Sequence, residues 1–414
     1  MVIKAIKGTR DILPPETALW THVENTAREV FSLYQFVEIR TPIFEQTELF
    51  ARGVGADTDI VSKEMYTFED RDEKSLTLRP EGTAPVVRAC LEHQLHQEGG
   101  IQKLFYLGPM FRRERPQKGR YRQFHQIGAE VFGSDHPAVE AEVLELLQLF
   151  LSRLGVTGFS VLVNSIGCNS CRPKYLEELR AALSSRSERL CADCQRRGET
   201  NPLRVLDCKV ESCQPVIEGL PSIMDFLDPD CRAHFERFCS YLHQREIPFT
   251  VVPRLVRGLD YYMRTTFEIT SGALGAQNTL IGGGRYDGLS EAIGGPPLKG
   301  FGFAMGVERL VLLLEQAGKQ AASPLSLFLA PVGEAAFNKA TLLALRLRSQ
   351  GIRCALDFEP RSLKSVMRLA NRSQAGHVLI LGDRELETGQ FQLKRMSDGT
   401  QVIITEEELL KYSF

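Results

Sequence analysis

The sequence predicts an α+β protein in two parts: a large domain whose antiparallel sheet is flanked by helices, and a smaller α/β domain after it. In the first third of the chain, short apolar runs follow one another without long helices between them, which favours antiparallel pairing. Residues 317–324 are rich in Ala, Gly, Lys, Ser and Pro, a composition typical of a linker. Beyond them, apolar runs alternate with helical stretches, the pattern of a largely parallel sheet. We therefore expect one domain over residues 1–322 and another over 323–414.

The composition describes a globular chain with a substantial core. Of 414 residues, 43% are hydrophobic and 25% are charged, which excludes disorder and collagen-like repeats. The formal net charge is −2, so local basic patches would have to hold any nucleic-acid partner. The first residues lack an apolar signal segment and no apolar run is long enough to span a bilayer. We expect a cytoplasmic protein that has no membrane partner.

The periodicity of apolar residues, together with capping and turn residues, predicts the helices and strands of the first domain. The expected helices cover residues 16–34, 137–154 and 307–316; the second has a proline and acidic residues in its first turn. The expected strands cover residues 36–39, 75–78, 103–109, 126–132, 249–255, 266–270 and 279–281. Between about 168 and 230 the composition becomes rich in Cys, Arg and Glu, so we expect a small inserted subdomain there.

The densest chemical signal is a basic segment between residues 111 and 133. Between residues 112 and 122 it holds six cations against a single acid, Glu114; the cations are Arg112, Arg113, Arg115, Lys118, Arg120 and Arg122. The planar guanidinium fork suits phosphate oxygens, so the segment favours an anionic ligand. Strand alternation would send Arg112 and Glu114 to one face and leave residues 116–119 as a turn. The alternative is a solvated basic loop.

Three further stretches carry candidate functional residues. Gly282, Gly283 and Gly284 would allow backbone to approach a ligand closely, and the run GFGFAMG then leads into a helix that carries Arg309. Neither run is a Walker loop or a dinucleotide fingerprint. The other stretches hold Arg257, Asp260, Tyr261 and Tyr262 before a strand, and Glu81 and Thr83 between a strand and a helix. Hairpin glycines and ordinary capped turns are the alternatives.

Six of the ten cysteines fall between residues 168 and 213. Two CxxC pairs with zinc-ribbon spacing predict one structural zinc site, with Cys168, Cys171, Cys191 and Cys194 as its ligands. Cys208 and Cys213 compete as ligands. The remaining cysteines are interpreted as core thiols: Cys90, Cys231, Cys239 and Cys354. No histidine forms an HExxH or Ser-His-Asp pattern, so hydrolytic zinc chemistry and a serine-nucleophile mechanism have no support.

Together these stretches resemble the bacterial type of histidyl-tRNA synthetase, a class II aminoacyl-tRNA synthetase, over nearly the whole chain. FVEIRTPIFEQTELF resembles motif 1, including the dimer-interface proline at Pro42, and residues 111–133 resemble motif 2. GFGFAMGVERL resembles motif 3, and RGLDYYMRTTFE resembles a signature of the histidine enzymes. Met263 and Arg264 occupy signature positions that vary in the family.

The resemblance implies a class II catalytic domain with an antiparallel sheet, a small insertion and a C-terminal α/β anticodon-binding domain, assembled as a homodimer. It implies ATP-dependent ligation of L-histidine to tRNA(His) through a histidyl-adenylate, with ATP and Mg²⁺ as cofactors. Fixed cations can stabilise the charge that builds on the α-phosphate without a covalent nucleophile.

The resemblance also assigns roles around the nucleotide. Arg112 would grip the α-phosphate, Glu114 would accept a hydrogen bond from the adenine amino group, and Phe124 would stack on the base. Arg120 and Arg309 would hold the γ-phosphate.

For histidine, the resemblance places Arg257 at the carboxylate and the α-phosphate, Glu130 and Tyr262 at the imidazole, and Tyr286 as the residue that closes the pocket. Glu130 and Gln126 are four apart on an expected strand and so share a face. The full expected histidine-binding set is Glu81, Thr83, Arg112, Gln126, Glu130, Arg257, Tyr261, Tyr262 and Tyr286. The alternative for each is a structural hydrogen bond. A site that pairs both ring nitrogens rejects isosteres that lack them.

Two groups are expected at tRNA. Arg115 and Gln117 resemble the residues that read the extra 5′ guanosine of tRNA(His). In the last domain, basic residues recur at helical spacing and form a stripe: Arg361, Lys364, Arg368 and Arg372. The stripe could bind tRNA phosphates or could be an ordinary solvated face, and the sequence favours neither.

Two rivals remain from the sequence. One is a regulatory subunit of ATP phosphoribosyltransferase, a paralogue on the same fold that usually lacks the RGLDYY signature and the anticodon domain. The other is a synthetase for glycine, proline or threonine, which would not be expected to carry Glu130 and Tyr262 in this arrangement.

Overall fold

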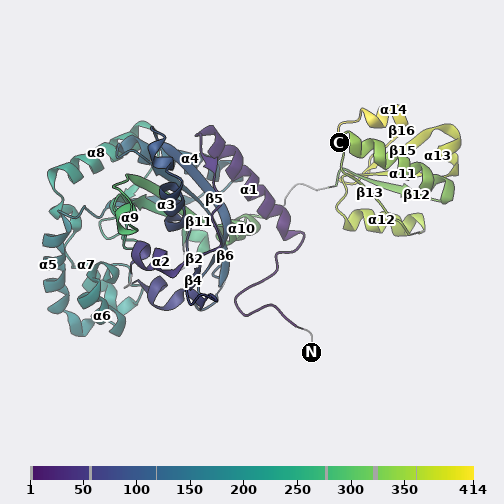
Figure 1. Cartoon of the computed structure of the whole chain (residues 1–414). Helices are drawn as coiled ribbons and strands as arrows, with labels where there is room; N and C mark the ends of the chain where they lie inside the picture. Colours follow the sequence, from purple (N-terminus) through teal and green to yellow (C-terminus); the bar gives the residue numbers. More distant parts are fainter. Residues whose placement is uncertain (1–2, 56–57, 118, 276–277, 320–324, 360) are drawn as a thin grey trace. The chain divides into compact units, whose positions relative to one another are not determined.

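The computed structural model describes residues 3–414 except 56–57, 118, 276–277, 320–324 and 360. The chain divides into two compact units, Met1–Lys319 and Gln320–Phe414, which are described separately here (Figure 1). The boundary expected between residues 322 and 323 lies outside the described residues.

An eight-stranded sheet organises the first unit. Its strand order is β1-β5-β6-β11-β10-β9-β7-β8. The strands are β1 (Val37–Glu38), β5 (Gln102–Phe111), β6 (Gln123–Phe132), β7 (Phe159–Ser165), β8 (Thr250–Val251), β9 (Met263–Ser271), β10 (Thr279–Arg285) and β11 (Gly300–Gly306). The six central strands pair antiparallel as expected, whereas the two short edge strands are parallel to their neighbours.

Two expected strands differ in extent from the observed ones. The strand expected over 249–255 is reduced to β8, because Pro253 has no N–H to donate to a ladder. The strand expected to end at residue 281 continues through three glycines to Arg285, because it is paired on both sides by β9 and β11. Strand pairing therefore overrides the weak strand propensity of glycine.

The register of the sheet leaves a hollow on one face. Glu130 of β6 lies opposite Gly302 of β11, which lies opposite Gly284 of β10. The neighbouring row on the same face runs from Tyr106 through small residues to Glu268; its members are Tyr106, Gly128, Ala304, Gly282 and Glu268. Small side chains in mid-sheet therefore leave space between large polar ones at the sides.

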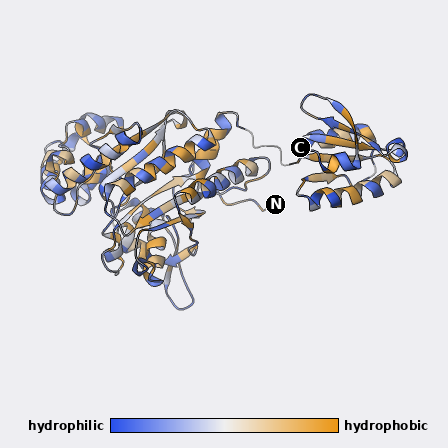
Figure 2. Cartoon of the chain, turned by 90° about the horizontal axis from the view of Figure 1, so that it is seen from above, coloured by the Kyte–Doolittle hydropathy of each residue, from blue (hydrophilic) through white to orange (hydrophobic). Residues whose placement is uncertain are grey.

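The opposite face is covered by helices and forms the core. Phe31 of α1 packs its ring against Phe105, Phe150 and Phe303, with ring centroids 5.3–6.0 Å apart. The helices of the first unit are α1 (Glu16–Leu33), α2 (Thr47–Val54), α3 (Thr83–Glu92), α4 (Pro137–Leu154), α5 (Arg172–Ser184), α6 (Ala192–Thr200), α7 (Gln214–Glu218), α8 (Pro229–Gln244), α9 (Leu289–Ala292) and α10 (Val307–Gln316). Several of these helices carry apolar residues along one side and polar residues along the other (Figure 2). This amphipathic pattern is what a sheet-covering layer requires.

A small second sheet and a helical insertion complete the first unit. The second sheet has the order β2-β4-β3, with strands β2 (Phe44–Gln46), β3 (Tyr66–Glu69) and β4 (Ser75–Leu78). Between β7 and α8 the chain forms α5, α6 and α7, joined by short 3₁₀ turns. Figure 1 shows these helices gathered in one region, next to α8. α8 itself packs on α4.

The second unit holds a five-stranded sheet of order β13-β12-β14-β15-β16. Its strands are β12 (Leu327–Pro331), β13 (Cys354–Leu356), β14 (His377–Leu381), β15 (Gln390–Arg395) and β16 (Gln401–Thr405), and its helices are α11 (Glu334–Ser349), α12 (Leu363–Arg372), α13 (Asp383–Thr388) and α14 (Glu406–Leu410). The expectation of a largely parallel sheet is wrong, because β14, β15 and β16 pair antiparallel. The connection between β15 and β16 is too short for a crossover helix and forms a hairpin.

Among the residues that the structure describes, no helix combines the length and the apolar character needed to cross a membrane.

Candidate active site

A cavity of about 810 Å³ opens over the hollow face of the large sheet. Among the expected site residues, those that line it are Glu81, Thr83, Arg112, Glu114, Arg120, Phe124, Gln126, Arg257, Tyr261, Tyr262 and Arg309. Glu130 and Tyr286 are buried directly behind the lining. Arg115 and Gln117 are exposed on the β5–β6 loop and do not line the cavity.

Arg112 enters the cavity from the end of the β5–β6 hairpin. β5 ends at Phe111, so Arg112 and Glu114 lie in the loop. The alternation of side chains along a strand, which we expected to set their directions, therefore does not apply to them. The backbone N–H of Arg112 still donates to Arg122 O at 2.9 Å, which continues the hairpin by one step. Its Nε donates to Pro80 O at 3.0 Å, and its guanidinium lies over the Phe124 ring at 5.2 Å. These contacts fix the direction of the guanidinium.

The tip of this loop is a turn in which Gln117 and Arg120 exchange backbone hydrogen bonds. Arg120 forms a salt bridge with Glu114, with 3.0 Å between Nη1 and Oε2. These two residues, both expected to bind the nucleotide, therefore fix each other's side chains at the cavity wall. Lys118, counted among the six cations, lies outside the described residues.

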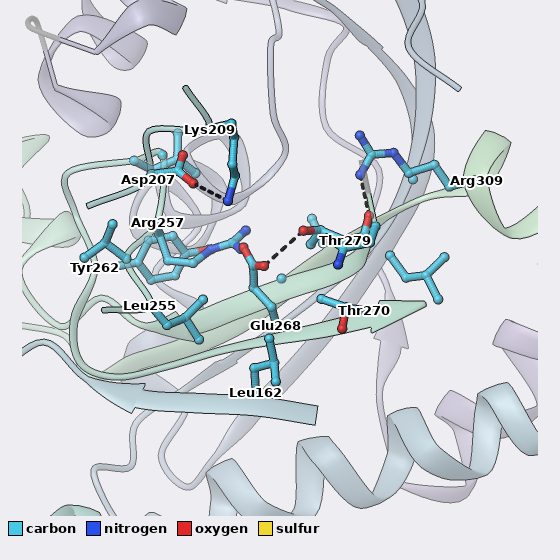
Figure 3. A pocket seen from close by; sticks show the side chains of 18 of the residues that line it. Leu162, Asp207, Lys209, Leu255, Arg257, Tyr262, Glu268, Thr270, Thr279 and Arg309 are labelled. Atoms are coloured by element: carbon cyan, nitrogen blue, oxygen red, sulfur yellow. Dashed lines mark hydrogen bonds and ion pairs between the residues drawn. The ribbon is translucent and has the colours of Figure 1, made fainter. Parts of the chain in front are cut away.

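Arg257 lies over the central glycines of the sheet (Figure 3). A Cβ on Gly282 would come within 2.1 Å of Arg257 Nη2, so only glycine leaves room for this guanidinium. Arg257 donates to Glu268 of β9, and Thr279 Oγ1 donates to the other oxygen of that carboxylate at 3.0 Å. Burial is the largest single influence on the pKa of Arg257 and lowers it, but the charge of Glu268, together with smaller contributions from Tyr262, Tyr261 and Asp207, leaves the pKa raised.

Arg309 reaches the cavity from the first turn of α10 and donates to the backbone carbonyl of Thr279 (Figure 3). Its pKa is lowered by burial and then by the positive charge of Arg120, with a smaller contribution from Arg112. Four of the expected arginines, Arg112, Arg120, Arg257 and Arg309, therefore line one cavity, an arrangement that favours an anionic ligand.

Glu130 is fully buried at the end of a polar pocket. Its carboxylate accepts hydrogen bonds from Thr83 Oγ1 at 2.7 Å, from Tyr106 OH at 3.4 Å and from Tyr286 OH. Gly302 on the facing strand makes room for it, because a Cβ there would lie 1.8 Å from Glu130 Oε2. Burial raises the pKa of Glu130 from its ordinary 4.5 to about 8.

The neighbouring polar groups have different partners. Glu81 accepts from the backbone N–H groups of Thr83 and Ala84 at 2.7 and 2.9 Å and so caps the start of α3. Gln126 Oε1 is buried and has no hydrogen-bond partner among the described residues. An unpaired buried oxygen costs free energy, so a bound ligand that donates to it would be favoured.

Sequence reasoning missed three residues that organise the site: Tyr106, which supports Glu130, Glu268, which pairs with Arg257, and Glu308. Glu308 accepts from the backbone N–H of His125 at 2.9 Å and lies 3.1 Å from its Nδ1. A signal for Glu268 exists in RTTFEI, where it is the single acid of a central strand. The insertion also contributes lining residues that were not expected, namely Asp207, Lys209, Gln214, Ile217 and Glu218.

The expected grouping of the cysteines is wrong. Cys168 and Cys171 lie with Asp228 and Cys231, whereas Cys191 and Cys194 lie with Cys208 and Cys213. The two CxxC pairs are separated by α5, whose 13 residues span roughly 20 Å. Cys231, interpreted as a core thiol, belongs to the first group. Cys90 and Cys354 are buried outside both groups, and Cys239 is half-buried.

The basic stripe of the second unit lies on and before α12. Arg361 pairs with Asp357. Lys364 and Arg368 border a shallow hollow of about 540 Å³, whose lining residues are Leu363, Lys364, Met367, Arg368, Asn371 and Lys394. Arg372 does not line it.

Two protein-family models match the chain. A histidyl-tRNA synthetase family model matches residues 8–310, and an anticodon-binding domain model matches residues 326–413. The chain is 57% identical to a histidine–tRNA ligase of Solibacter usitatus, covering 99% of this chain and 98% of the relative. It is 53% identical to one of Koribacter versatilis, covering 99% and 96%. The crystal structure of apo S. aureus histidyl-tRNA synthetase matches with a TM-score of 0.82 at 38% identity, covering 99% of both chains. With its class II sheet, its helical insertion and its C-terminal anticodon-binding domain, the chain belongs to the histidyl-tRNA synthetase family.

Proposed function

We propose that this chain joins L-histidine to tRNA(His) with ATP, through a histidyl-adenylate. The observation that carries the proposal is that Arg112 and Arg257, far apart in the sequence, line one cavity whose inner end is the polar pocket of Glu130. The printed names of the relatives support the overall reaction.

In the first step, a carboxylate oxygen of histidine attacks the α-phosphorus of ATP, the bond to the bridging oxygen breaks, and pyrophosphate leaves. Negative charge builds on the non-bridging α-phosphate oxygens. Arg112 and Arg257 stabilise it as preorganised cations, since their guanidinium groups are already held by the carbonyl oxygen of Pro80 and by the carboxylate of Glu268. In the second step, a hydroxyl oxygen of the terminal ribose of the tRNA attacks the carbonyl carbon of the histidyl-adenylate, the anhydride bond to the phosphate breaks, and AMP leaves.

The proposed position of ATP rests on the residues that line the cavity. The adenine stacks on Phe124, its amino group donates to Glu114, and Arg120 and Arg309 hold the γ-phosphate. When bound with ATP, Mg²⁺ would supply charge neutralisation at the triphosphate. The donor set fits it, because the carboxylates of Glu268 and Glu308 line the cavity and offer the hard oxygen ligands that Mg²⁺ prefers.

In the proposed site, histidine is selected by polar groups with which an imidazole can form hydrogen bonds. One ring nitrogen pairs with Glu130 and the other with Tyr262, while Tyr286 closes the pocket and Tyr261 packs beside it at 5.7 Å between ring centroids. The α-amino group donates to a further set of acceptors: Glu81, Thr83 and Gln126. The unpaired Oε1 of Gln126 supports this assignment.

The proposed partners of this chain are tRNA(His) and a second copy of the chain. Arg115 and Gln117 at the exposed loop tip read the 5′ end of the tRNA, and the reaction takes place in the cytoplasm, where ATP and tRNA are available. The homodimer is supported by large apolar side chains that are exposed around Pro42, namely Val37, Ile43 and Phe44.

The test is ATP–pyrophosphate exchange with each amino acid in turn. Exchange with histidine alone is the expected result. Exchange with glycine, proline or threonine would assign the chain to a sister enzyme, and no exchange with any amino acid would favour a regulatory subunit.

A further inference from the structure

The insertion contains two separate groups of metal-ligating side chains. We call Cys168, Cys171, Asp228 and Cys231 cluster 1. Cluster 2 consists of Cys191, Cys194, Cys208 and Cys213. Within each cluster, the four ligand atoms all lie within 4.8 Å of one another.

The sulfur separations match a tetrahedral metal site. With zinc–sulfur bonds of about 2.3 Å, a tetrahedron sets neighbouring sulfurs roughly 3.8 Å apart. Cys168 Sγ and Cys171 Sγ are 3.6 Å apart in cluster 1, and Cys191 Sγ and Cys208 Sγ are 4.0 Å apart in cluster 2. A disulfide would require about 2.05 Å. The spacing therefore suits a shared ion between the sulfurs better than a bond between them.

Asp228 completes cluster 1 with an oxygen. Its Oδ1 accepts from the backbone N–H of Cys231 at 2.7 Å and caps α8, which fixes the carboxylate. Its Oδ2 then lies 3.2 Å from the sulfurs of both Cys168 and Cys171. The ligands come as two pairs with the same internal spacing, CxxC and DxxC. This spacing is common in structural zinc sites.

Backbone N–H groups point at the sulfurs in both clusters. Asp228 N donates to Cys171 Sγ at 3.3 Å in cluster 1. In cluster 2, Cys191 N donates to Cys213 Sγ at 3.2 Å and Val210 N donates to Cys208 Sγ at 3.4 Å. A thiolate bound to a metal keeps negative charge, and such N–H donors stabilise it as outer partners of the ligand.

We propose that the insertion binds two structural zinc ions, one at cluster 1 through three thiolates and a carboxylate, and one at cluster 2 through four thiolates. Sulfur ligands select zinc over the harder Mg²⁺ and Ca²⁺. Each cysteine loses its thiol proton to solvent as its Zn–S bond forms, so binding releases three protons at cluster 1 and four at cluster 2.

The two ions have different structural roles. Cluster 1 ties the segment that follows β7 to the start of α8, so it closes the two ends of the insertion on each other. Cluster 2 holds the segment around Cys208 and Cys213, and residues of that segment, Asp207, Lys209 and Gln214, line the cavity. The zinc ions therefore position one wall of the cavity and take no part in the chemistry.

Metal content of the full chain tests the proposal without any substrate, so its outcome is independent of the proposed activity. Protein purified under reducing conditions, loaded with zinc and desalted should carry two equivalents of zinc per chain by mass spectrometry. Cys231→Ser and Cys213→Ser should each retain one equivalent, and the double variant none. The matched control Cys239→Ser, in a half-buried cysteine outside both clusters, should retain two.

Several outcomes would overturn the proposal. A zinc content of one equivalent or less in the wild-type chain would do so, and so would preferential retention of another metal over zinc. Equal zinc content in wild type and both cluster variants would place the ions elsewhere.

Cobalt substitution of the wild-type chain provides a measurement that does not depend on variants folding. Two tetrahedral sites with seven thiolates in all should give intense thiolate-to-cobalt charge-transfer absorption that saturates at two equivalents. Chelation should abolish it. Absorption that saturates at one equivalent, or weak absorption typical of oxygen ligation, would contradict the two sites.

Discussion

Glu130 and Glu268 lie on the same face of the large sheet, yet their surroundings differ. Glu268 is paired with Arg257, a cation, whereas Glu130 is surrounded by the hydroxyl groups of Thr83, Tyr106 and Tyr286. The hydroxyl donors compensate the burial of Glu130 only in part, so burial raises the pKa of Glu130 to about 8. Residue type alone therefore does not determine what an acid does in this cavity.

Arg112→Ala should lower the rate of histidine-dependent ATP–pyrophosphate exchange by about 10²- to 10³-fold, because one preorganised cation at the α-phosphate is lost. The matched control is Arg113→Ala, which removes the adjacent exposed arginine and should leave the rate near that of the wild type. Urea unfolding of both variants checks that the fold is intact. Near-normal exchange by a folded Arg112→Ala protein would refute the assigned role.

Glu130 should make the stability of the free protein fall as pH rises. Its pKa is about 8 in the folded chain and near 4.5 when unfolded, so between these values the folded state binds more protons. The free energy of unfolding then decreases with pH at a slope that approaches about 1.4 kcal/mol per pH unit. Below pH 4.5 this contribution to stability is fully present, and above pH 8 it is lost. Urea unfolding from pH 5 to 8 should show a shallower decrease for Glu130→Gln; parallel curves would contradict the assignment.

At the scale of elements, β10 and β11 carry the glycines that create the cavity. The Arg257 guanidinium occupies the space above Gly282, and Glu130 occupies the space above Gly302. Two polar side chains from other segments thus lie in close contact with the middle of a sheet. The glycine-rich strands are binding surfaces in which the missing side chains provide the room.

Gly282→Ala should reduce exchange activity about 100-fold while it leaves the protein folded. The three nearest atoms to an added Cβ all belong to the Arg257 guanidinium, so a flexible side chain is displaced and the sheet is kept. A displacement of about 1 Å at a reacting centre costs roughly that factor. Gly272→Ala is the control, because a Cβ there meets nothing within 4 Å. Exchange kinetics and urea midpoints measured together decide the outcome; equal activity of both variants would disprove the packing argument.

At the scale of the whole molecule, the cavity and α12 belong to different compact units. The cavity lies entirely in Met1–Lys319, and the basic hollow beside α12 lies in Gln320–Phe414. If the second unit binds tRNA, amino-acid activation and tRNA affinity should respond to separate substitutions.

Arg368→Ala should raise the KM for tRNA several-fold and leave histidine-dependent exchange unchanged. Loss of one phosphate contact should also reduce the slope of log K against log salt by about one. Arg384→Ala, an exposed arginine on α13, is the control for a change of net charge. Aminoacylation rates at several tRNA concentrations give the KM, and fluorescence anisotropy of labelled tRNA at several salt concentrations gives the slope. An unchanged slope would identify α12 as an ordinary solvated face.

Local sequence signals predicted much of the fold. The helices at residues 137–154 and 307–316 and the strand at 75–78 have the expected bounds, because capping residues and apolar periodicity act over a few positions. The β15–β16 hairpin was not predicted. The partner of a strand is set by segments elsewhere in the chain, so a parallel or antiparallel arrangement is poorly encoded in the strand itself.

The same limit applies to the sites. The sequence by itself determined which residues are candidates to meet a phosphate or an imidazole, because a basic segment and family motifs are local patterns, and the family resemblance then assigns roles to Arg112, Arg257 and Glu130. Only the tertiary structure decided that Glu268 pairs with Arg257 and that Cys171 groups with Cys231 and not with Cys191. The physical reason is that these contacts join segments whose approach depends on the pairing of whole strands and helices, which no short stretch of sequence specifies.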